Sequence, residues 1–380
     1  MRYALLLLLA AATGTALYLG LTAPRAAPDA RSFETSAGEV VVERVVGPFA
    51  HPWAVGFLPG GAMLVTERGG KLWHLGPDGT RAEVAGVPTV HAAGQGGLLD
   101  VVPARDFAES REIFLTYSEP REGGSATALA VARLSAGAET LENLRVIFRQ
   151  QPAVQSSKHY GSRVVEAPDG TLWVTLGDRG LPTQAQIAQS HLGKVVRINR
   201  DGSVPDDNPY RGGIARPELW SIGHRNAQGA ALDPETGALW TVAHGPKGGD
   251  EINRPEPGRN YGWPLITYGV DYSGMKVGEG THKEGMEQPL HYWDPSIAPS
   301  GMAIYSGRLW PQWAGDIFVG ALKFRLISRL EREGDAITGE ERLFEGVYGR
   351  VRDVREGPDG ALWFVTDEAD GGLYRVRPAK

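Results

Sequence analysis

A histidine and an aspartate in separate loop segments form the first candidate chemical group of this sequence. His159 lies in the segment 158–163, and Asp178 lies in the segment 177–180. They occupy the two ends of one predicted strand pair, so their loops can meet on the same face. An imidazole oriented by a carboxylate is a suitable general base near neutral pH. Histidines are also common as ordinary packed loop residues, and the spacing alone leaves both interpretations open.

Two further loop segments carry side chains that could bind a polar ligand. In the segment 222–229, Arg225 can hold a carboxylate through two hydrogen bonds, and Asn226 can donate to a carbonyl or an oxyanion. In the segment 94–100, Gln95 lies among glycines that let a backbone approach closely. A solvated loop and a tight strand entry are the alternative interpretations of these segments.

The segment 244–253 combines glycines with two carboxylates, Asp250 and Glu251. Hard cations such as Ca²⁺ take carbonyl and carboxylate oxygens as ligands, and this composition offers both. The segment therefore indicates a candidate cation site, with a solvated loop as the alternative.

Four basic residues late in the chain point to an anionic ligand. They are Lys323 with Arg325, and Arg350 with Arg352. Residues two apart in a strand share a face, so Arg350 and Arg352 are expected to project together. Cations of one sign repel one another unless an anion joins them. Each of these residues taken singly is also typical of an exposed strand charge.

Repeated β-rich phrases indicate the elements that must position these loops. A turn followed by a short apolar strand recurs six times, with the strands aligned at Met63, Ile113, Leu172, Leu239, Ile317 and Leu362. The copies lie 45 to 78 residues apart, and a propeller blade needs about 40 to 50 residues plus its loops. We therefore predict an all-β chain, a six-bladed β-propeller over residues 40–380 closed by a terminal strand. The ligand site is expected at the mouth of its central channel.

Composition excludes several classes of protein. The 380 residues include no Cys, which removes disulfides, thiolate metal sites, iron–sulfur clusters and covalently attached haem. The net charge of −6 argues against a nucleic-acid partner, which would require a basic face. The fingerprints of zinc proteases, phosphate-binding loops and serine hydrolases are absent from the sequence.

The N-terminus is typical of an export segment. Arg2 precedes an uncharged apolar run from Ala4 to Leu21. Residues 1–27 are therefore interpreted as a signal peptide or an N-terminal membrane anchor, followed by a linker over 28–39. Either interpretation predicts an exported protein, periplasmic or extracellular, that touches a membrane only through this segment.

Several motifs in order resemble the soluble pyrroloquinoline-quinone (PQQ)-dependent sugar dehydrogenases, above all the bacterial aldose sugar dehydrogenases. The resemblance covers nearly the whole chain after the N-terminal segment. Its most specific phrases lie at 223–226, 245–253, 260–264, 296–300 and 349–354. The family is a six-bladed propeller, in agreement with the repeat count.

The resemblance implies a role for each candidate residue. His159 would be the general base that takes a hydroxyl proton at the anomeric carbon of an aldose, and Asp178 would orient its imidazole. The residues implied to contact the quinone or line the active site are Gln95, Arg225, Asn226, Lys323, Arg350 and Arg352, with Tyr272, Phe324 and Arg325 in matching segments. Gly245 and Pro246 would bind the active-site Ca²⁺ through their backbone. Glu251 and the carbonyl of Tyr261 would bind a second, structural Ca²⁺.

The resemblance has limits, and two other functions remain open. The longer loops and sugar-binding aromatics of the glucose-specific members are not found, so oxidation of a broad range of aldoses is expected. No haem-attachment motif is present, so electrons must pass to an external acceptor such as a quinone, a cytochrome or a dye. The alternatives are a calcium-dependent propeller hydrolase such as a lactonase, and a non-catalytic propeller that binds an extracellular partner.

Overall fold

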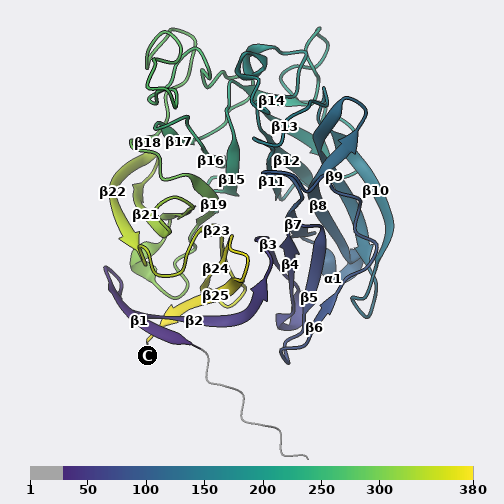
Figure 1. Ribbon diagram of the computed structural model, residues 1–380, viewed down its shortest axis with the longest axis vertical. Helices are drawn as coiled ribbons and strands as arrows, with labels where there is room; N and C mark the ends of the chain where they lie inside the picture. The colour runs from purple at the N-terminus through teal and green to yellow at the C-terminus, as the bar shows by residue number, and fades with distance from the viewer. Residues whose placement is uncertain (1–28, 380) are drawn as a thin grey trace, which may run out of the picture.

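The computed structural model describes residues 29–379, and residues 1–27, the expected export segment, lie outside this range. Apart from α1 (Phe107–Ser110) and 3-10 turns at Pro59–Gly61, Pro182–Gln186 and Pro311–Trp313, its elements are strands. The strands form six antiparallel sheets arranged in a ring (Figure 1). The predicted six-bladed β-propeller is therefore confirmed.

Each of the first five blades is a four-stranded sheet whose strands follow the chain from the channel outward. Blade 1 contains β3 (Pro52–Phe57), β4 (Met63–Glu67), β5 (Lys71–Leu75) and β6 (Arg81–Glu83). Blade 2 contains β7 (Leu98–Pro103), β8 (Glu112–Arg121), β9 (Gly124–Leu134) and β10 (Leu141–Arg149). Blade 3 contains β11 (Gly161–Glu166), β12 (Thr171–Leu176), β13 (Lys194–Asn199) and β14 (Leu219–Ile222).

The remaining blades continue the ring back to its start. Blade 4 contains β15 (Ala227–Leu232), β16 (Leu239–Ala243), β17 (Asp250–Asn253) and β18 (His291–Trp293). Blade 5 contains β19 (Pro299–Ile304), β20 (Ile317–Ala321), β21 (Leu326–Glu333) and β22 (Ala336–Leu343). Blade 6 contains β23 (Val351–Glu356), β24 (Leu362–Thr366), β25 (Gly371–Pro378), β2 (Gly38–Phe49) and β1 (Ala30–Thr35).

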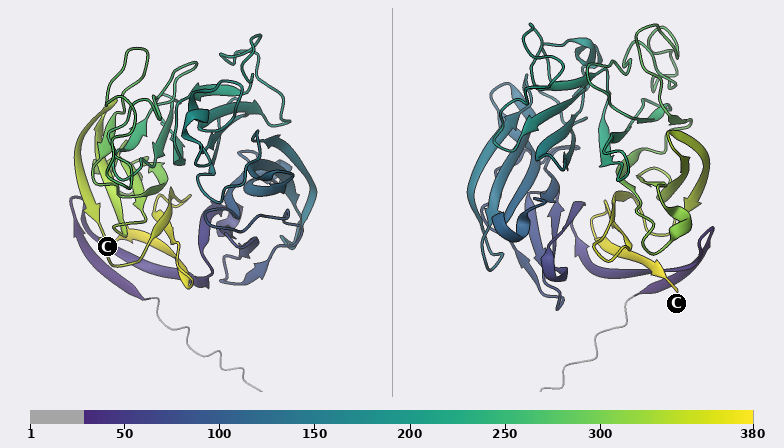
Figure 2. Two further views of the ribbon diagram at one scale, coloured as in Figure 1. Left: turned by 45° about the horizontal axis from the view of Figure 1, so that its top comes forward. Right: turned by 180° about the vertical axis from the view of Figure 1, so that it is seen from behind.

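Blade 6 joins the two ends of the described chain. β2 pairs antiparallel with β25, and the two lie side by side in both views of Figure 2. The prediction that a terminal strand closes the ring is thus confirmed. The expected linker over 28–39 is corrected, because residues 30–35 form β1 at the outer edge of this sheet. Phe33 holds β1 in place by packing edge-on against Phe344, with ring centroids 4.9 Å apart.

The six apolar repeats in the sequence are the second strands of the six blades, β4, β8, β12, β16, β20 and β24. Every residue of β4, β16, β20 and β24 is buried. This burial follows from the ring, since each blade is covered by its neighbours on both faces. The hydrophobic core is accordingly divided into clusters that each combine residues of two adjacent blades.

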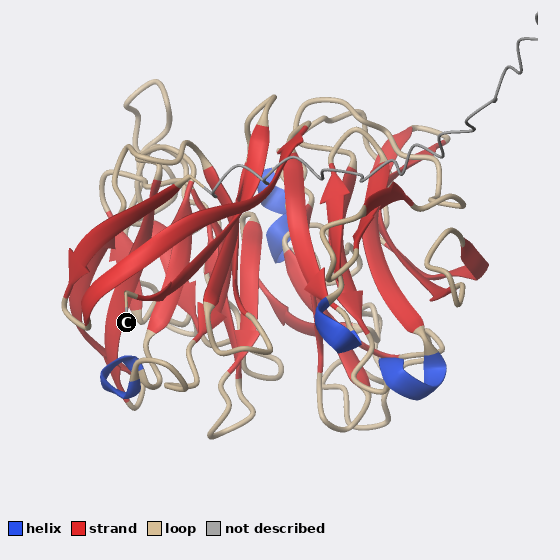
Figure 3. Cartoon of the chain, turned by 90° about the horizontal axis from the view of Figure 1, so that it is seen from below, coloured by secondary structure: helices blue, strands red, loops and turns tan. Residues whose placement is uncertain are grey.

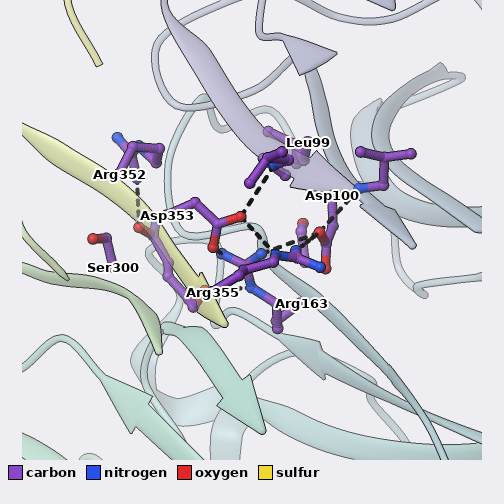
Figure 4. A network of polar contacts seen from close by, with 12 residues as sticks. Leu99, Asp100, Arg163, Ser300, Arg352, Asp353 and Arg355 are labelled. Atoms are coloured by element: carbon purple, nitrogen blue, oxygen red, sulfur yellow. Dashed lines mark hydrogen bonds and ion pairs between the residues drawn. The ribbon is translucent and has the colours of Figure 1, made fainter. Parts of the chain in front are cut away.

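Four charged side chains meet in the central channel and link three blades (Figure 4). Arg163 on β11 binds Asp100 on β7 at 3.1 Å and Asp353 on β23 at 3.0 Å. Arg355 binds the same two carboxylates, with 2.8 Å between its Nε and Asp353. Two cations thus balance two anions, and the network ties the inner strands together by ionic contacts.

The strand directions place the candidate residues on one face of the ring. In an antiparallel blade, the start of the inner strand and the end of the second strand lie at the same edge. Gln95, His159, Arg225, Asn226 and Arg350 precede inner strands, whereas Asp178, Gly245, Pro246 and Lys323 follow second strands. Figure 3 shows the ring edge-on, with loops gathered at both ends of the strands. Among residues 29–379, no helix is long and apolar enough to span a membrane.

Candidate active site

The predicted pairing of His159 with Asp178 is present. His159 Nδ1 lies 2.6 Å from Asp178 Oδ1, and both side chains are buried. His159 has a left-handed backbone, with a φ of 56°, immediately before the inner strand β11. Because the carboxylate can only accept, Nδ1 carries the proton. The lone pair of the imidazole is therefore on Nε2, which has no hydrogen-bond partner among the described residues.

Asp178 is itself fixed by two donors. The indole Nε1 of Trp263 donates to Asp178 Oδ2 at 2.8 Å, and the amide of Gly180 donates to Oδ1 at 2.8 Å. Burial would raise the pKa of Asp178, but the hydrogen bonds and charges from His159 and its neighbours outweigh it and lower the pKa. The carboxylate therefore stays ionised beside the imidazole.

Burial lowers the pKa of His159, and only part of this effect is offset by Asp178. The positive charge of Arg225 lowers the pKa of His159 further. The imidazole is thus neutral near pH 7, which is the state that a general base requires.

Gln95 and Asn226 hold the loop that carries His159. Gln95 Oε1 accepts the backbone amide of His159 at 2.7 Å, and Asn226 Oδ1 accepts the amide of Gly161 at 3.0 Å. At Gly177 an added Cβ would lie 1.9 Å from the His159 carbonyl. Only glycine permits this approach of the two loops. The structure therefore brings both predicted polar residues beside His159.

Arg225 is a buried cation without a carboxylate partner in the described part of the chain. Its side chain donates to the carbonyl of His244 at 3.2 Å and lies 5.3 Å from the Trp263 ring centroid. The residue is only 9% exposed. A buried guanidinium whose partners are all neutral lacks a counter-charge, and an anionic ligand would supply one.

Arg352 differs from the sequence-based expectation. Taken singly it was also typical of an exposed strand charge, but it is 5% exposed and bound to Asp367. Its Nη1 also donates to Gln228 at 2.7 Å, while its buried Nε has no hydrogen-bond partner within 29–379. Burial and then the positive charge of Arg352 lower the pKa of Arg350.

The segment of Lys323, Phe324 and Arg325 is only partly directed to the site. Lys323 is exposed, and its amide donates to the carbonyl of Ile297 at 3.1 Å. The ring of Phe324 packs against the core between blades 4 and 5, with Arg342 of the outer strand β22 at 5.6 Å. Arg325 is exposed in a left-handed conformation. Lys323 and Arg325 are thus accessible, whereas the Phe324 ring packs in the core, with Lys323 Nζ 5.0 Å from its centroid.

Tyr272 lies at the tip of a tight turn and is 71% exposed. Its turn is joined to the loop of Pro246, because the amide of Lys247 donates to the carbonyl of Val270 at 3.0 Å. Tyr272 is therefore an exposed residue of a turn that is bonded to the loop of Pro246.

The loop of Gly245 and Pro246 presents backbone oxygens. Neither carbonyl accepts a hydrogen bond from residues 29–379. Asp250 shapes this loop, since its Oδ1 accepts the Gly245 amide at 2.8 Å and its Oδ2 accepts the Ile297 amide at 2.7 Å. Asp250 thus supports the loop, and the two free carbonyls are what a hard cation could use.

Glu251 and Tyr261 are the residues expected to bind a second cation. Burial raises the pKa of Glu251 to about 7, and no basic side chain of the described residues pairs with it. The Tyr261 ring stacks on His224 at 4.8 Å, and its carbonyl accepts no hydrogen bond in the described range. One small cavity is lined by Glu251, His224 and Trp263 together with Arg225 and Gly245.

No cluster of three or more His, Asp or Glu side chains suited to a metal occurs in the range 29–379. The candidate cation sites consist mainly of backbone carbonyls, which such a cluster would not include. The expectation of calcium therefore rests on the free carbonyl oxygens and on Glu251, which has no cationic partner within 29–379 and accepts a hydrogen bond from Asn253 at 3.1 Å.

Three groups that complete the site were not assigned from the sequence: Trp263, Gln228 and Asp367. Trp263 anchors Asp178, Gln228 anchors Arg352, and Asp367 neutralises Arg352. Trp263 and Gln228 lie inside the motifs at 260–264 and 222–229. Their position inside these motifs could have indicated a role in the site. However, the residues that they bind lie 85 and 124 positions away along the chain.

Comparisons with known proteins identify the family of this chain. The sequence profile of the Glucose / Sorbosone dehydrogenase family matches residues 49–375. The aldose sugar dehydrogenase YliI of Escherichia coli K12 is 46% identical over 346 residues, covering 89% of this chain and 93% of that protein.

Two solved structures extend the comparison. The apo-form of the soluble aldose sugar dehydrogenase of Escherichia coli superposes with a TM-score of 0.87 at 45% identity, covering 89% of this chain and 99% of that one. The PQQ-bound aldose sugar dehydrogenase of Streptomyces coelicolor superposes with a TM-score of 0.75 at 26% identity, covering 92% and 100%. This chain therefore belongs to the glucose/sorbosone dehydrogenase family.

Proposed function

We propose that this protein oxidises aldose sugars at the anomeric carbon to lactones, using PQQ and Ca²⁺ and passing the electrons to an external acceptor. The observation that carries the proposal is the pair of His159 and Asp178 with a free Nε2. This pair lies beside the buried, unpaired Arg225, in a member of a sugar dehydrogenase family.

The residues of the site fit a quinone that bears carboxylates. Arg225 lacks a counter-charge, and the buried Nε of Arg352 lacks an acceptor within the described residues. A carboxylate of the cofactor would satisfy both, and Gln95, Asn226, Lys323, Arg325 and Arg350 would add polar contacts, with Tyr272 and the Phe324 segment at the rim. The free carbonyls of Gly245 and Pro246 would hold the active-site Ca²⁺, while Glu251 and the Tyr261 carbonyl would hold a structural one.

The side chains of this protein would handle the proton. His159 Nε2 would take the proton of the anomeric hydroxyl, and Asp178 would stabilise the imidazolium that forms. Trp263 keeps the carboxylate in place through its 2.8 Å hydrogen bond. When bound, the quinone supplies the hydride acceptor and Ca²⁺ polarises it as a Lewis acid. The C–H and O–H bonds of the sugar break together with formation of the lactone carbonyl.

Two consequences follow for the partners and the location. The chain contains no Cys and hence no covalently attached haem, so a separate acceptor must receive the electrons. Residues 1–27 have the composition of an export segment, so we infer activity in the periplasm or outside the cell.

Reconstitution tests the proposal. The apo-protein is incubated with PQQ and Ca²⁺, and reduction of a dye is followed after addition of glucose and other aldoses. We expect dye reduction that requires both PQQ and an aldose. Cleavage of lactones in the absence of PQQ, together with no sugar-dependent dye reduction, would instead support the hydrolase alternative.

A further inference from the structure

A second histidine–aspartate pair lies on the same face of the ring as the active site. His51 Nδ1 lies 2.9 Å from Asp367 Oδ1. The other oxygen of Asp367 binds Arg352, and Arg68 lies 3.7 Å from it. The buried carboxylate of Asp367 thus interacts with three basic side chains.

The position of His51 resembles that of His159. His51 directly precedes the inner strand β3 and has a left-handed backbone, with a φ of 53°. Two backbone hydrogen bonds hold it there, from its amide to the Glu368 carbonyl at 2.8 Å and from the Arg68 amide to its carbonyl at 3.0 Å. The strained conformation is therefore built into the junction of blades 1 and 6. Its side chain is 44% exposed, so the imidazole is open to a ligand.

The corner cluster consists of His51, Arg68, Arg350, Arg352, Asp367 and Glu368. Its three guanidinium groups face two carboxylates. Glu368 accepts the backbone amide of Arg350 at 3.0 Å and forms no ion pair with a described arginine side chain. The Nε of Arg352 is buried without an acceptor. The cluster therefore carries excess positive charge and an unsatisfied donor, which is the environment that a carboxylate ligand would complete.

We propose that His51 and Arg68 extend the cofactor site as carboxylate-binding residues, and that Asp367 is the positioning residue that orients His51 and Arg352 toward the ligand. This inference rests on the proposed function, because PQQ supplies the carboxylates. Arg225 and Lys323 approach the site from blades 4 and 5, whereas His51 and Arg68 approach it from the opposite side, in blade 1.

The imidazole of His51 has one ring nitrogen left for a ligand. Because Nδ1 is bonded to Asp367, this nitrogen is Nε2. The protonated ring would present an N–H and a positive charge to a carboxylate there. The charged groups around His51 are Asp367, Arg68 and Arg352, with Glu67 binding the Ala50 amide at 2.8 Å and pairing with Arg81.

The test is direct titration of the apo-protein with PQQ by calorimetry, at fixed Ca²⁺ and constant ionic strength. Arg68→Gln should weaken binding about tenfold, the effect of one charge-assisted hydrogen bond. Arg68→Lys should restore part of the loss. The matched control is Arg133→Gln, which removes an exposed guanidinium on β9 and should leave the affinity unchanged.

His51→Asn removes Nε2 and keeps the contact with Asp367. Asparagine tolerates the left-handed backbone and can still donate to Asp367. The variant should bind PQQ about five- to tenfold more weakly than the wild type. His282→Asn, at an exposed position, is the control.

The outcomes separate this inference from the proposed function. Unchanged PQQ affinity in Arg68→Gln, or in His51→Asn, would overturn the corner cluster while PQQ binding by the wild type persists. Failure of the wild type to bind PQQ would overturn the proposed function itself. Should Arg68→Gln fail to fold, the His51→Asn series decides alone.

Discussion

Trp263 donates its indole proton to Asp178 across 85 positions of the chain, with 2.8 Å between Nε1 and Oδ2. This bond connects the loop after β17 to the carboxylate that orients His159. The general base is therefore supported by a residue from another blade.

Trp263→Phe removes that bond and keeps an aromatic ring beside Arg225. A hydrogen bond to a charged group is worth about 1.5 to 3 kcal/mol, so we expect turnover to fall by about tenfold or more. The control is Trp173→Phe, because the Trp173 indole nitrogen is buried without a partner in the described chain. Equal turnover in both variants would show that the bond to Asp178 has no catalytic consequence.

His159→Ala should lower turnover by about 10² to 10⁴ and leave PQQ affinity largely intact, since it removes only the proton acceptor. Turnover of the quinone-loaded variant and calorimetric binding to the apo-variant measure the two effects. His282→Ala, at an exposed position, serves as the control. Near-normal turnover in His159→Ala would remove His159 from the mechanism.

Arg225 and Arg352 should respond differently to truncation. Arg225→Ala removes an unpaired cation, so PQQ affinity should fall about tenfold to a hundredfold while the unfolding free energy changes by about 1 kcal/mol or less. Arg352→Ala leaves Asp367 buried beside fewer cations, so it should also cost about 3 to 5 kcal/mol of stability. Urea denaturation of the apo-proteins measures the second effect. Similar unfolding curves for both variants would contradict the structural role of the ion pair.

The Glu251 carboxyl group is expected to make the unfolding free energy depend on both pH and Ca²⁺. Burial raises the pKa of Glu251 to about 7, above its ordinary value near 4.5. The folded state therefore binds a proton that the unfolded state has lost, and without Ca²⁺ this group makes stability fall as the pH rises from about 4.5 to 7.

Ca²⁺ should reverse this loss, adding about 2.7 kcal/mol at a concentration one hundred times its Kd. Glu251→Gln should be less sensitive to pH over this window and should gain less from Ca²⁺, whereas Glu256→Gln should behave as the wild type. Thermal unfolding with and without chelator provides the measurement. An undiminished gain from Ca²⁺ in Glu251→Gln would place the cation elsewhere.

The sequence predicted the ring because its second strands are covered on both faces and so appear as continuous apolar runs after turns. It did not predict β1, since this mostly exposed edge strand shows no such run. The pairing of His159 with Asp178 could be predicted, because the two residues lie at the two ends of one predicted strand pair. The pairing of Arg352 with Asp367 could not be predicted, because their spacing of 15 residues gives no sign that the two side chains meet.

The most direct test of the account is rapid mixing of the PQQ- and Ca²⁺-loaded protein with glucose in the absence of any electron acceptor. The absorbance of the quinone is followed with ordinary glucose and with glucose deuterated at the anomeric carbon. We predict that the quinone is reduced, that a lactone is formed, and that deuterium slows the reduction, since the anomeric C–H bond breaks in this step. An unchanged quinone spectrum would contradict the proposed sugar oxidation.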